Sequence, residues 1–171
     1  MFVVVTNMVD LQMNDEIYHP FLEEYGYEVY DGAVSMHQNL FFDFSDNSMW
    51  ESNANGMNTL MALFELGDQD LFISIEKIYA TCASDGAMLD LSTVLPKELL
   101  EKYEDKLMYT RDDEESEFYP CGVKVDGNPW IEKMQKNYRG YIGIIENSDD
   151  HEMAADFIEY FLKQFDQMEG T

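Results

Sequence analysis

The first 76 residues of the chain contain neither lysine nor arginine. The first basic side chain is Lys77, and 14 carboxylates precede it. The whole chain has 10 lysines and arginines and 35 aspartates and glutamates, so its formal net charge is −25. A protein of this charge repels nucleic acid and anionic membranes. We therefore expect no direct binding to either, and we expect a basic protein as the partner.

Cysteine is scarce, and long apolar runs are absent. Cys82 and Cys121 are the two cysteines and form no CxxC pattern, which is typical of a reduced cytosolic protein rather than a disulfide framework. No stretch of 18 apolar residues occurs, so we expect no transmembrane helix. Residues 1–6 lack the positive segment of a signal peptide. These absences predict a cytosolic location.

Recognised catalytic and cofactor-binding motifs are missing as well. The sequence has no HExxH, GxSxG, Walker or GxGxxG motif and no EF-hand loop, and its three histidines lie in no known frame. We therefore predict no catalytic residue, no cofactor and no resident metal, and a protein that is not an enzyme. Two groups of side chains are candidates for weak binding of a divalent cation: Asp43, Asp46 and Glu51, and Asp149, Asp150 and His151.

Apolar residues are plentiful and mostly follow helical spacing. With 46% hydrophobic and 14% aromatic residues, a chain of 171 residues predicts one domain, residues 1–171. The expected fold is mostly α, a single helical domain with at most a small β element, and α+β is the alternative. Segment 2–13 fits a strand or a helix, and alternation at 72–75 keeps a strand open there. Helices are predicted over residues 14–25, 29–44, 58–66, 71–82, 130–138 and 149–168, with a short one opening at Pro96.

Turn and cap residues mark the ends of these elements. Asn14 and Ser148 are the expected N-caps of the first and last helices, and Gly67 is expected to end the helix over residues 58–66. Residues 120–129 are expected to form a loop or hairpin, and residues 141–145 are a short apolar run.

The last predicted helix has two distinct faces. Met153, Phe157, Phe161 and Phe165 form an apolar stripe, which we expect in the core, with a homodimer seam as the alternative. The opposite face is acidic and has Lys163 as its one opposing cation.

Three segments of the first two thirds share the character of one known family. They are Glu28-Val-Tyr-Asp-Gly-Ala-Val34, the aromatic Leu40-Phe-Phe-Asp-Phe-Ser-Asp46 and Leu60-Met-Ala-Leu-Phe-Glu-Leu-Gly-Asp68. Together, over roughly residues 16–118, they resemble the DNA-mimic protein family of small acidic bacterial proteins. The resemblance implies a mostly helical, often dimeric fold whose acidic surface occupies the DNA site of a DNA-binding protein. Six residues match the family motifs, whereas Asp31 and Ala33 depart from them: the matches are Glu28, Val29, Gly32, Leu63, Leu66 and Gly67.

The size of the net charge agrees with this hypothesis. A globule of this length is about 40 Å across, and duplex DNA carries on the order of 24 charges over that span. We therefore predict a protein that blocks the nucleic-acid site of a transcription factor, nucleoid protein or restriction or CRISPR nuclease. The alternative is an immunity protein that neutralises one cognate nuclease toxin. The carboxylates expected to contact the partner are Asp15, Glu16, Glu23, Glu24, Glu28, Asp31, Asp112, Asp113, Glu114, Glu115, Glu117, Asp149, Asp150, Glu152, Asp156 and Glu159.

Overall fold

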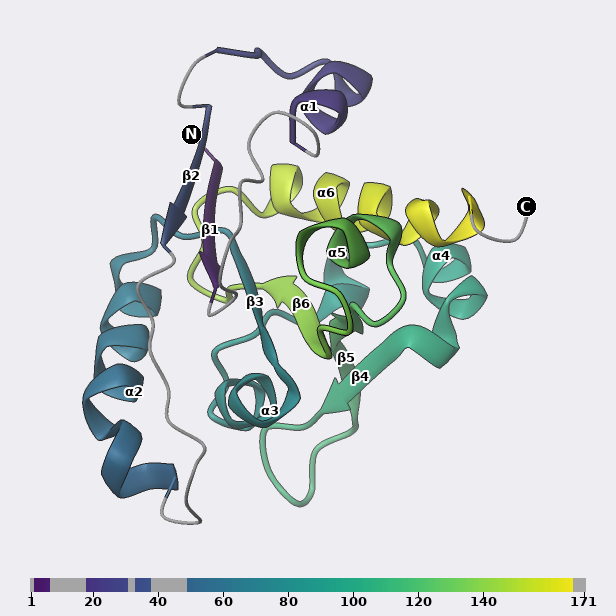
Figure 1. Ribbon diagram of the computed structural model, residues 1–171. Helices are drawn as coiled ribbons and strands as arrows, with labels where there is room; N and C mark the ends of the chain where they lie inside the picture. The colour runs from purple at the N-terminus through teal and green to yellow at the C-terminus, as the bar shows by residue number, and fades with distance from the viewer. Residues whose placement is uncertain (1, 7–17, 31–32, 38–48, 168–171) are drawn as a thin grey trace.

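A mixed β-sheet runs through the middle of the molecule, with helices on both of its faces (Figure 1). The computed structural model describes residues 2–6, 18–30, 33–37 and 49–167. The sheet has six strands in the order β2-β1-β3-β6-β5-β4. β2 and β3 pair in parallel with β1, and the remaining pairs are antiparallel. The strands are β1 (Phe2–Thr6), β2 (Val34–His37), β3 (Leu71–Ile75), β4 (Leu107–Thr110), β5 (Tyr119–Lys124) and β6 (Gly140–Ile144).

The helices cover the sheet through two separate apolar clusters. The larger cluster joins one face of the sheet to α1, α4, α5 and α6, and the smaller joins the other face to α2 and α3. This three-layer arrangement explains how a chain of this charge folds, because most large apolar side chains of the described residues are buried or partly buried in the two clusters. The helices are α1 (His19–Tyr25), α2 (Met49–Leu66), α3 (Glu76–Ser84), α4 (Lys97–Lys102), α5 (Pro129–Met134) and α6 (His151–Lys163), with short 3-10 turns at Leu91–Thr93, Glu104–Lys106 and Gln164–Gln167.

The prediction of a mostly α fold is wrong, because the structure is α+β. The helix predicted over residues 71–82 divides into β3 and α3. Leu71, Phe72 and Ile73 are all buried, and they contribute to both clusters. A strand covered on both faces loses its alternating pattern and reads as a continuous apolar run. Its spacings of three and four residues then imitate a helix.

Three other strands lie in segments that were not predicted as strands. The helix predicted over residues 29–44 contains β2 at Val34–His37, and most of the rest of that segment lies outside the described residues. The segment 120–129, predicted as a loop or hairpin, contains most of β5, including Pro120. Residues 141–145, noted only as apolar, belong largely to β6.

Several helix predictions are confirmed in part. For the helix predicted over residues 58–66, the end before Gly67 is confirmed, because α2 ends at Leu66, although α2 begins earlier, at Met49. Pro20 lies in the first turn of α1, where a missing N–H is tolerated. The predicted cap at Asn14 lies outside the described residues. α4 and α5 form at the expected places but are only six residues long each.

The apolar stripe of α6 is in the core, as predicted. Phe157 and Phe161 are each 1% exposed and contact rings from α1 and α5. Phe157 stacks on Tyr18 at 5.1 Å and meets Phe21 edge-on at 5.1 Å. The chain itself buries these two rings, and Met153 and Phe165 pack partly buried against the same cluster, while a homodimer stays a prediction.

Tyr79 of α3 packs against the antiparallel part of the sheet, on the face covered by α2 and α3. Its ring is fully buried and its hydroxyl donates a 2.7 Å hydrogen bond to the backbone oxygen of Cys121. A Cβ added at Gly122 would lie 2.7 Å from the Tyr79 ring, and one at Gly143 would overlap the hydroxyl. Glycine at both positions therefore makes room for this ring.

Candidate functional site

The predicted contact residues that the structure describes form two groups rather than one surface. Asp15, Glu16 and Asp31 lie outside the described residues. The β4–β5 loop, residues 111–118, lies at the end of the molecule away from α1 and α6 (Figure 1). It contains Asp112, Asp113, Glu114, Glu115 and Glu117. The other group, which we name the α1–α6 surface, comprises Glu23, Glu24, Glu28, Asp149, Asp150, Glu152, Asp156 and Glu159.

Two tyrosines join α1 to α6 within the α1–α6 surface. Tyr27 donates a 2.6 Å hydrogen bond from its hydroxyl to Asp156 Oδ2, and Tyr25 donates to Glu159 Oε1 at 3.4 Å. Gly26 makes this possible, since its φ of 77° ends α1 with a left-handed turn. Tyr27 N–H then bonds the oxygen of Leu22 at 2.7 Å. The turn thus places both rings beside the exposed side of α6.

The electrostatic surroundings of the two tyrosines differ. Burial raises the pKa of Tyr27 well above its ordinary range, and the hydrogen bond to Asp156 and the charges of Asp156, Asp150 and Glu152 raise it further. Burial also raises the pKa of Tyr25, but there Lys163 acts in the opposite direction. The charges that raise the pKa of Tyr27 most are those of three carboxylates, so this part of the surface is acidic.

Some of these acids also serve the fold. Asp150 is the N-cap of α6, accepting a 3.1 Å hydrogen bond from Met153 N–H, and Glu152 lies in the first turn. Both positions favour negative charge because the helix dipole is positive there. The cap predicted at Ser148 is displaced: Ser148 Oγ accepts from Asp150 N–H at 3.1 Å and donates to buried Asp70 at 2.8 Å.

The β4–β5 loop is ordered by its own hydrogen bonds. The Asp113 carboxylate accepts from the Ser116 hydroxyl and from the N–H groups of Glu115 and Ser116, and these bonds lower the pKa of Asp113. Arg111 donates to the backbone oxygen of Glu114 at 2.9 Å, and its guanidinium lies 4.9 Å from the centroid of the exposed Phe118 ring. The loop therefore presents its carboxylates from a defined turn.

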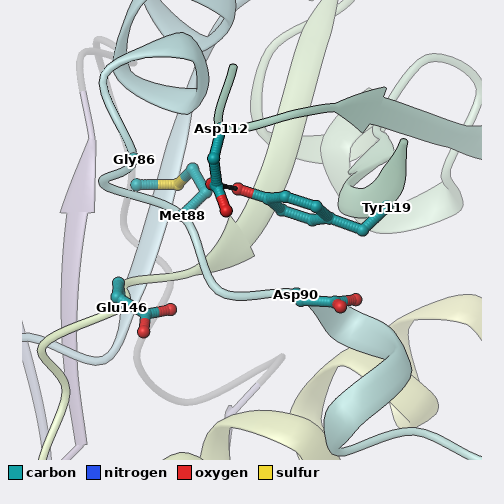
Figure 2. Close-up of a pocket in the computed structure, with 6 residues that line it drawn as sticks. All are labelled: Gly86, Met88, Asp90, Asp112, Tyr119 and Glu146. Atoms are coloured by element: carbon teal, nitrogen blue, oxygen red, sulfur yellow. Dashed lines mark hydrogen bonds between the residues drawn. The ribbon is translucent and has the colours of Figure 1, made fainter. Parts of the chain in front are cut away.

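A pocket of about 250 Å³ lies beside this loop (Figure 2). Its lining comprises Gly86, Met88, Asp90, Asp112, Tyr119 and Glu146. The Tyr119 hydroxyl donates to Asp112 at 2.8 Å, and Asp90 accepts from the N–H and hydroxyl of Ser92. The sequence analysis missed Asp90 and Glu146, because nothing in the sequence marks two isolated acids so far apart as neighbours.

The structure offers no metal centre among the residues it describes, where no group of three potential ligands is found. His151, one of the weak candidates, places Nε2 3.1 Å from the backbone oxygen of Glu146. Asp43 and Asp46 of the other candidate lie outside the described residues. Cys82 and Cys121 are free and buried, and burial raises the pKa of each thiol to about 12. Such thiols are poor nucleophiles at neutral pH.

The fold and surfaces together define an acidic α+β protein with three layers and two separate groups of carboxylates. No family model, curated protein or solved structure matches the chain. The resemblance to the DNA-mimic family therefore stays a hypothesis. In the described part of the chain, no helix has the length and apolar character needed to cross a membrane.

Proposed function

We propose that the protein binds the basic nucleic-acid site of another protein through its α1–α6 surface and blocks that site. One observation carries the proposal: Tyr27 donates its hydroxyl to Asp156 at 2.6 Å, and Asp150 and Glu152 are the other charges that raise its pKa most. An acidic surface of this kind attracts a groove lined with lysine and arginine and speeds association.

The spacing of the α6 carboxylates suits this role. Four of them lie between residues 150 and 159, a span of about 14 Å in an α-helix. Their average separation along the axis is thus about 4–5 Å, compared with about 3.4 Å for the phosphates of one DNA strand. Glu23, Glu24 and Glu28 add a second row from the neighbouring segment, all of them exposed.

Aromatic groups give this surface more than charge. Tyr25 and Tyr27 are half-buried, and Tyr30, two residues after Glu28, is 47% exposed. Tyrosine is enriched among the residues that contribute most to protein interfaces, and its ring stacks on arginine. The target we propose is accordingly an arginine-containing nucleic-acid site of a cytosolic protein.

The fixed tyrosine–carboxylate pairs also support the second candidate, an immunity protein for one nuclease toxin. Side chains already held by hydrogen bonds lose little freedom on binding, which favours one well-matched partner over many. An immunity protein would protect nucleic acid from a single nuclease, whereas a general mimic would displace DNA from several proteins.

A capture experiment with matched variants tests the proposal. The immobilised protein would be incubated at low salt with a cytosolic extract of the organism that encodes it, and bound proteins eluted with duplex DNA. We expect DNA and about 0.5 M NaCl to release the bound proteins, because salt screens the attraction. The triple variant E23Q/E24Q/E152Q should capture much less, and the control E65Q/E98Q/E104Q, which removes three exposed carboxylates elsewhere, should capture as much as the wild type.

Either of two results would contradict the proposal. One is capture that neither DNA nor salt reverses. The other is equal loss of capture in both triple variants, which would show that total charge matters and the α1–α6 surface does not.

A further inference from the structure

β4 is the last strand of the sheet on its antiparallel side, and its outer edge is open. β5 pairs with one side of it, and no other named element packs extensively against it in the described structure (Figure 1). Outside that ladder, Leu107 N–H bonds the backbone oxygen of Glu104 at the start of the strand, and for Met108–Thr110 the described structure gives no further backbone–backbone hydrogen bond. Leu107 and Met108 are half-buried and Tyr109 is 43% exposed. The backbone groups on the outer edge are therefore free to pair with another strand.

The strand lacks three of the features with which proteins protect such an edge, namely proline, charged side chains within the strand, and a bulge in the edge strand itself. Its protection comes only from its length of four residues. The sequence Leu-Met-Tyr-Thr contains neither proline nor a charge. The irregularity in the β4–β5 pair belongs to β5: Met108 pairs with Gly122 and Tyr109 with Pro120, so the extra residue is Cys121. β4 is thus regular, although short.

A second copy of the chain is a poor partner for this edge. In an antiparallel pair of two β4 strands that aligns all four residues, Leu107 of each copy lies opposite Thr110 of the other. At each end, Lys106 of one copy then approaches Arg111 of the other, and both of these residues directly flank the strand. Like charges directly opposite one another destabilise a strand pair. The flanks therefore disfavour self-pairing in that register.

We propose that β4 binds an extended segment of a basic partner protein as a seventh strand, running antiparallel to β4. In that direction the residues that precede the paired segment lie beside the β4–β5 loop. The loop holds five carboxylates and one arginine, so it favours lysine or arginine at those positions. The partner segment consequently has basic residues first, and then apolar or β-branched residues that pair with Leu107–Thr110. Backbone hydrogen bonds supply affinity in this mode and the flanking charges set its direction.

This interaction is independent of the function proposed for the α1–α6 surface, because it uses a different edge of the molecule. Each could be lost without the other, and one set of variants separates them.

A synthetic peptide tests the proposal on the full-length protein. The probe is Lys-Arg-Lys-Gly-Val-Thr-Val-Thr with a fluorescent label, and its affinity is measured by anisotropy at low salt. Hydrogen exchange read by NMR shows where it binds. We expect slower amide exchange within Leu107–Thr110. A probe with N-methyl groups on alternate residues of the Val-Thr segment should bind at least about tenfold more weakly, because it cannot form the backbone bonds. The reversed sequence should also bind more weakly.

Matched charge variants complete the test. E114Q/E115Q/E117Q should weaken probe binding about three- to tenfold, whereas E23Q/E24Q/E152Q, which removes as many charges from the α1–α6 surface, should leave it unchanged. Equal binding of the N-methylated probe would overturn the proposal, since charge alone would then explain the affinity. Absence of binding, or absence of protection at β4, would also overturn it. Protection of β4 in a concentrated sample without peptide would identify a second copy as the occupant instead.

Discussion

The two halves of α6 bury the same apolar stripe but present opposite charge environments. Toward its N-terminus, Asp150, Glu152 and Asp156 are the charges that raise the pKa of Tyr27 most. Toward its C-terminus, Glu159 pairs with Lys163 at 2.6 Å, and Asp166 in the following turn pairs with Lys102 at 2.6 Å. Lys106 adds a cation 5.3 Å from the centroid of the Phe165 ring.

This difference shows that the fold does not require the unbalanced charge. The C-terminal half packs equally well with its carboxylates paired to lysines from α4 and from α6 itself. The N-terminal half could have used the same solution, since its buried face is of the same kind. Asp150 and Glu152 also stabilise the start of α6, and Glu159 is paired with Lys163, so the charges that the proposed partner would neutralise are chiefly those of the N-terminal half.

The largest expected effect on stability comes from removing the buried ring of Phe157, in the middle of α6. Phe157→Ala should lower the free energy of unfolding by about 3–5 kcal/mol, because the ring is 1% exposed and its removal leaves a cavity among Tyr18, Phe21 and Trp130. Urea unfolding followed by tyrosine and tryptophan fluorescence measures it. Leu66→Ala is the control: Leu66 is 68% exposed, so its loss should change stability by no more than about 0.5 kcal/mol. A loss below about 1 kcal/mol for Phe157→Ala would contradict the packing described for α6.

A smaller effect should distinguish the two tyrosines. Tyr27→Phe removes a 2.6 Å bond to a carboxylate and should cost about 1–2 kcal/mol, whereas Tyr25→Phe, at 3.4 Å, should cost less than about 1 kcal/mol. Urea unfolding at neutral pH compares them. The reverse order would show that Lys163, rather than the phenol–carboxylate bond, holds α1 to α6.

The same pair predicts a pH dependence. The pKa of Tyr27 is raised in the folded state, so its contribution to stability is complete below the ordinary tyrosine pKa of about 10 and is lost as pH rises through the folded value. Above pH 10 the wild type should therefore lose more stability than Tyr27→Phe does. Equal losses in the two proteins would contradict this.

The smallest effects test the charge difference directly. Glu24→Gln removes a carboxylate from the last turn of α1, where other acids and the helix dipole disfavour it, and should raise the free energy of unfolding by a few tenths of a kcal/mol. Asp166→Asn breaks the exposed pair with Lys102 and should lower that free energy by no more than about 1 kcal/mol. Both changes should shrink in 0.5 M NaCl. The same sign for both variants would contradict the contrast between the two surfaces.

Low pH should reduce the stability of the paired C-terminal half of α6 through Asp166. Its pKa is lowered, chiefly by the hydrogen bond from Lys102, so its contribution is present above the ordinary carboxyl pKa of about 3.9 and is lost as pH falls through the lower folded value. Asp166→Asn should remove that part of the acid sensitivity.

The sequence predicted those elements whose pattern comes from one buried face. α6 has a solvent side, so Met153, Phe157 and Phe161 recur at helical spacing and the stripe was correctly placed in the core. β3 is covered on both faces, so the spacing of three and four residues outweighed the alternation at 72–75, and the segment was assigned to a helix although the strand alternative is the one confirmed. The fold class was wrong because the central strands are covered by helices on both faces.

The sequence predicted the individual carboxylates of the site but not how the fold arranges them. Ten of the thirteen predicted carboxylates that the structure describes are exposed, since acids belong in water, and Asp150, Asp156 and Glu159 are half-buried. Their division into two surfaces depends on topology. Tyr25 and Glu159 are 134 positions apart and meet because α1 and α6 pack on the same face of the sheet. The open edge of β4 likewise follows from strand order, which a single sequence does not reveal.

The packing of Tyr79 against Gly122 and Gly143 limits which substitutions the sequence can accept at these positions. A Cβ at Gly122 or Gly143 would collide with the Tyr79 side chain, and at Gly143 it would also lie 2.7 Å from the backbone oxygen of Cys121. The three positions form one inherited unit in which a single replacement by a larger residue at either glycine creates a collision, and loss of the ring leaves a hole. In a collection of descendants of this chain, we expect these three positions to stay fixed together or to change in concert.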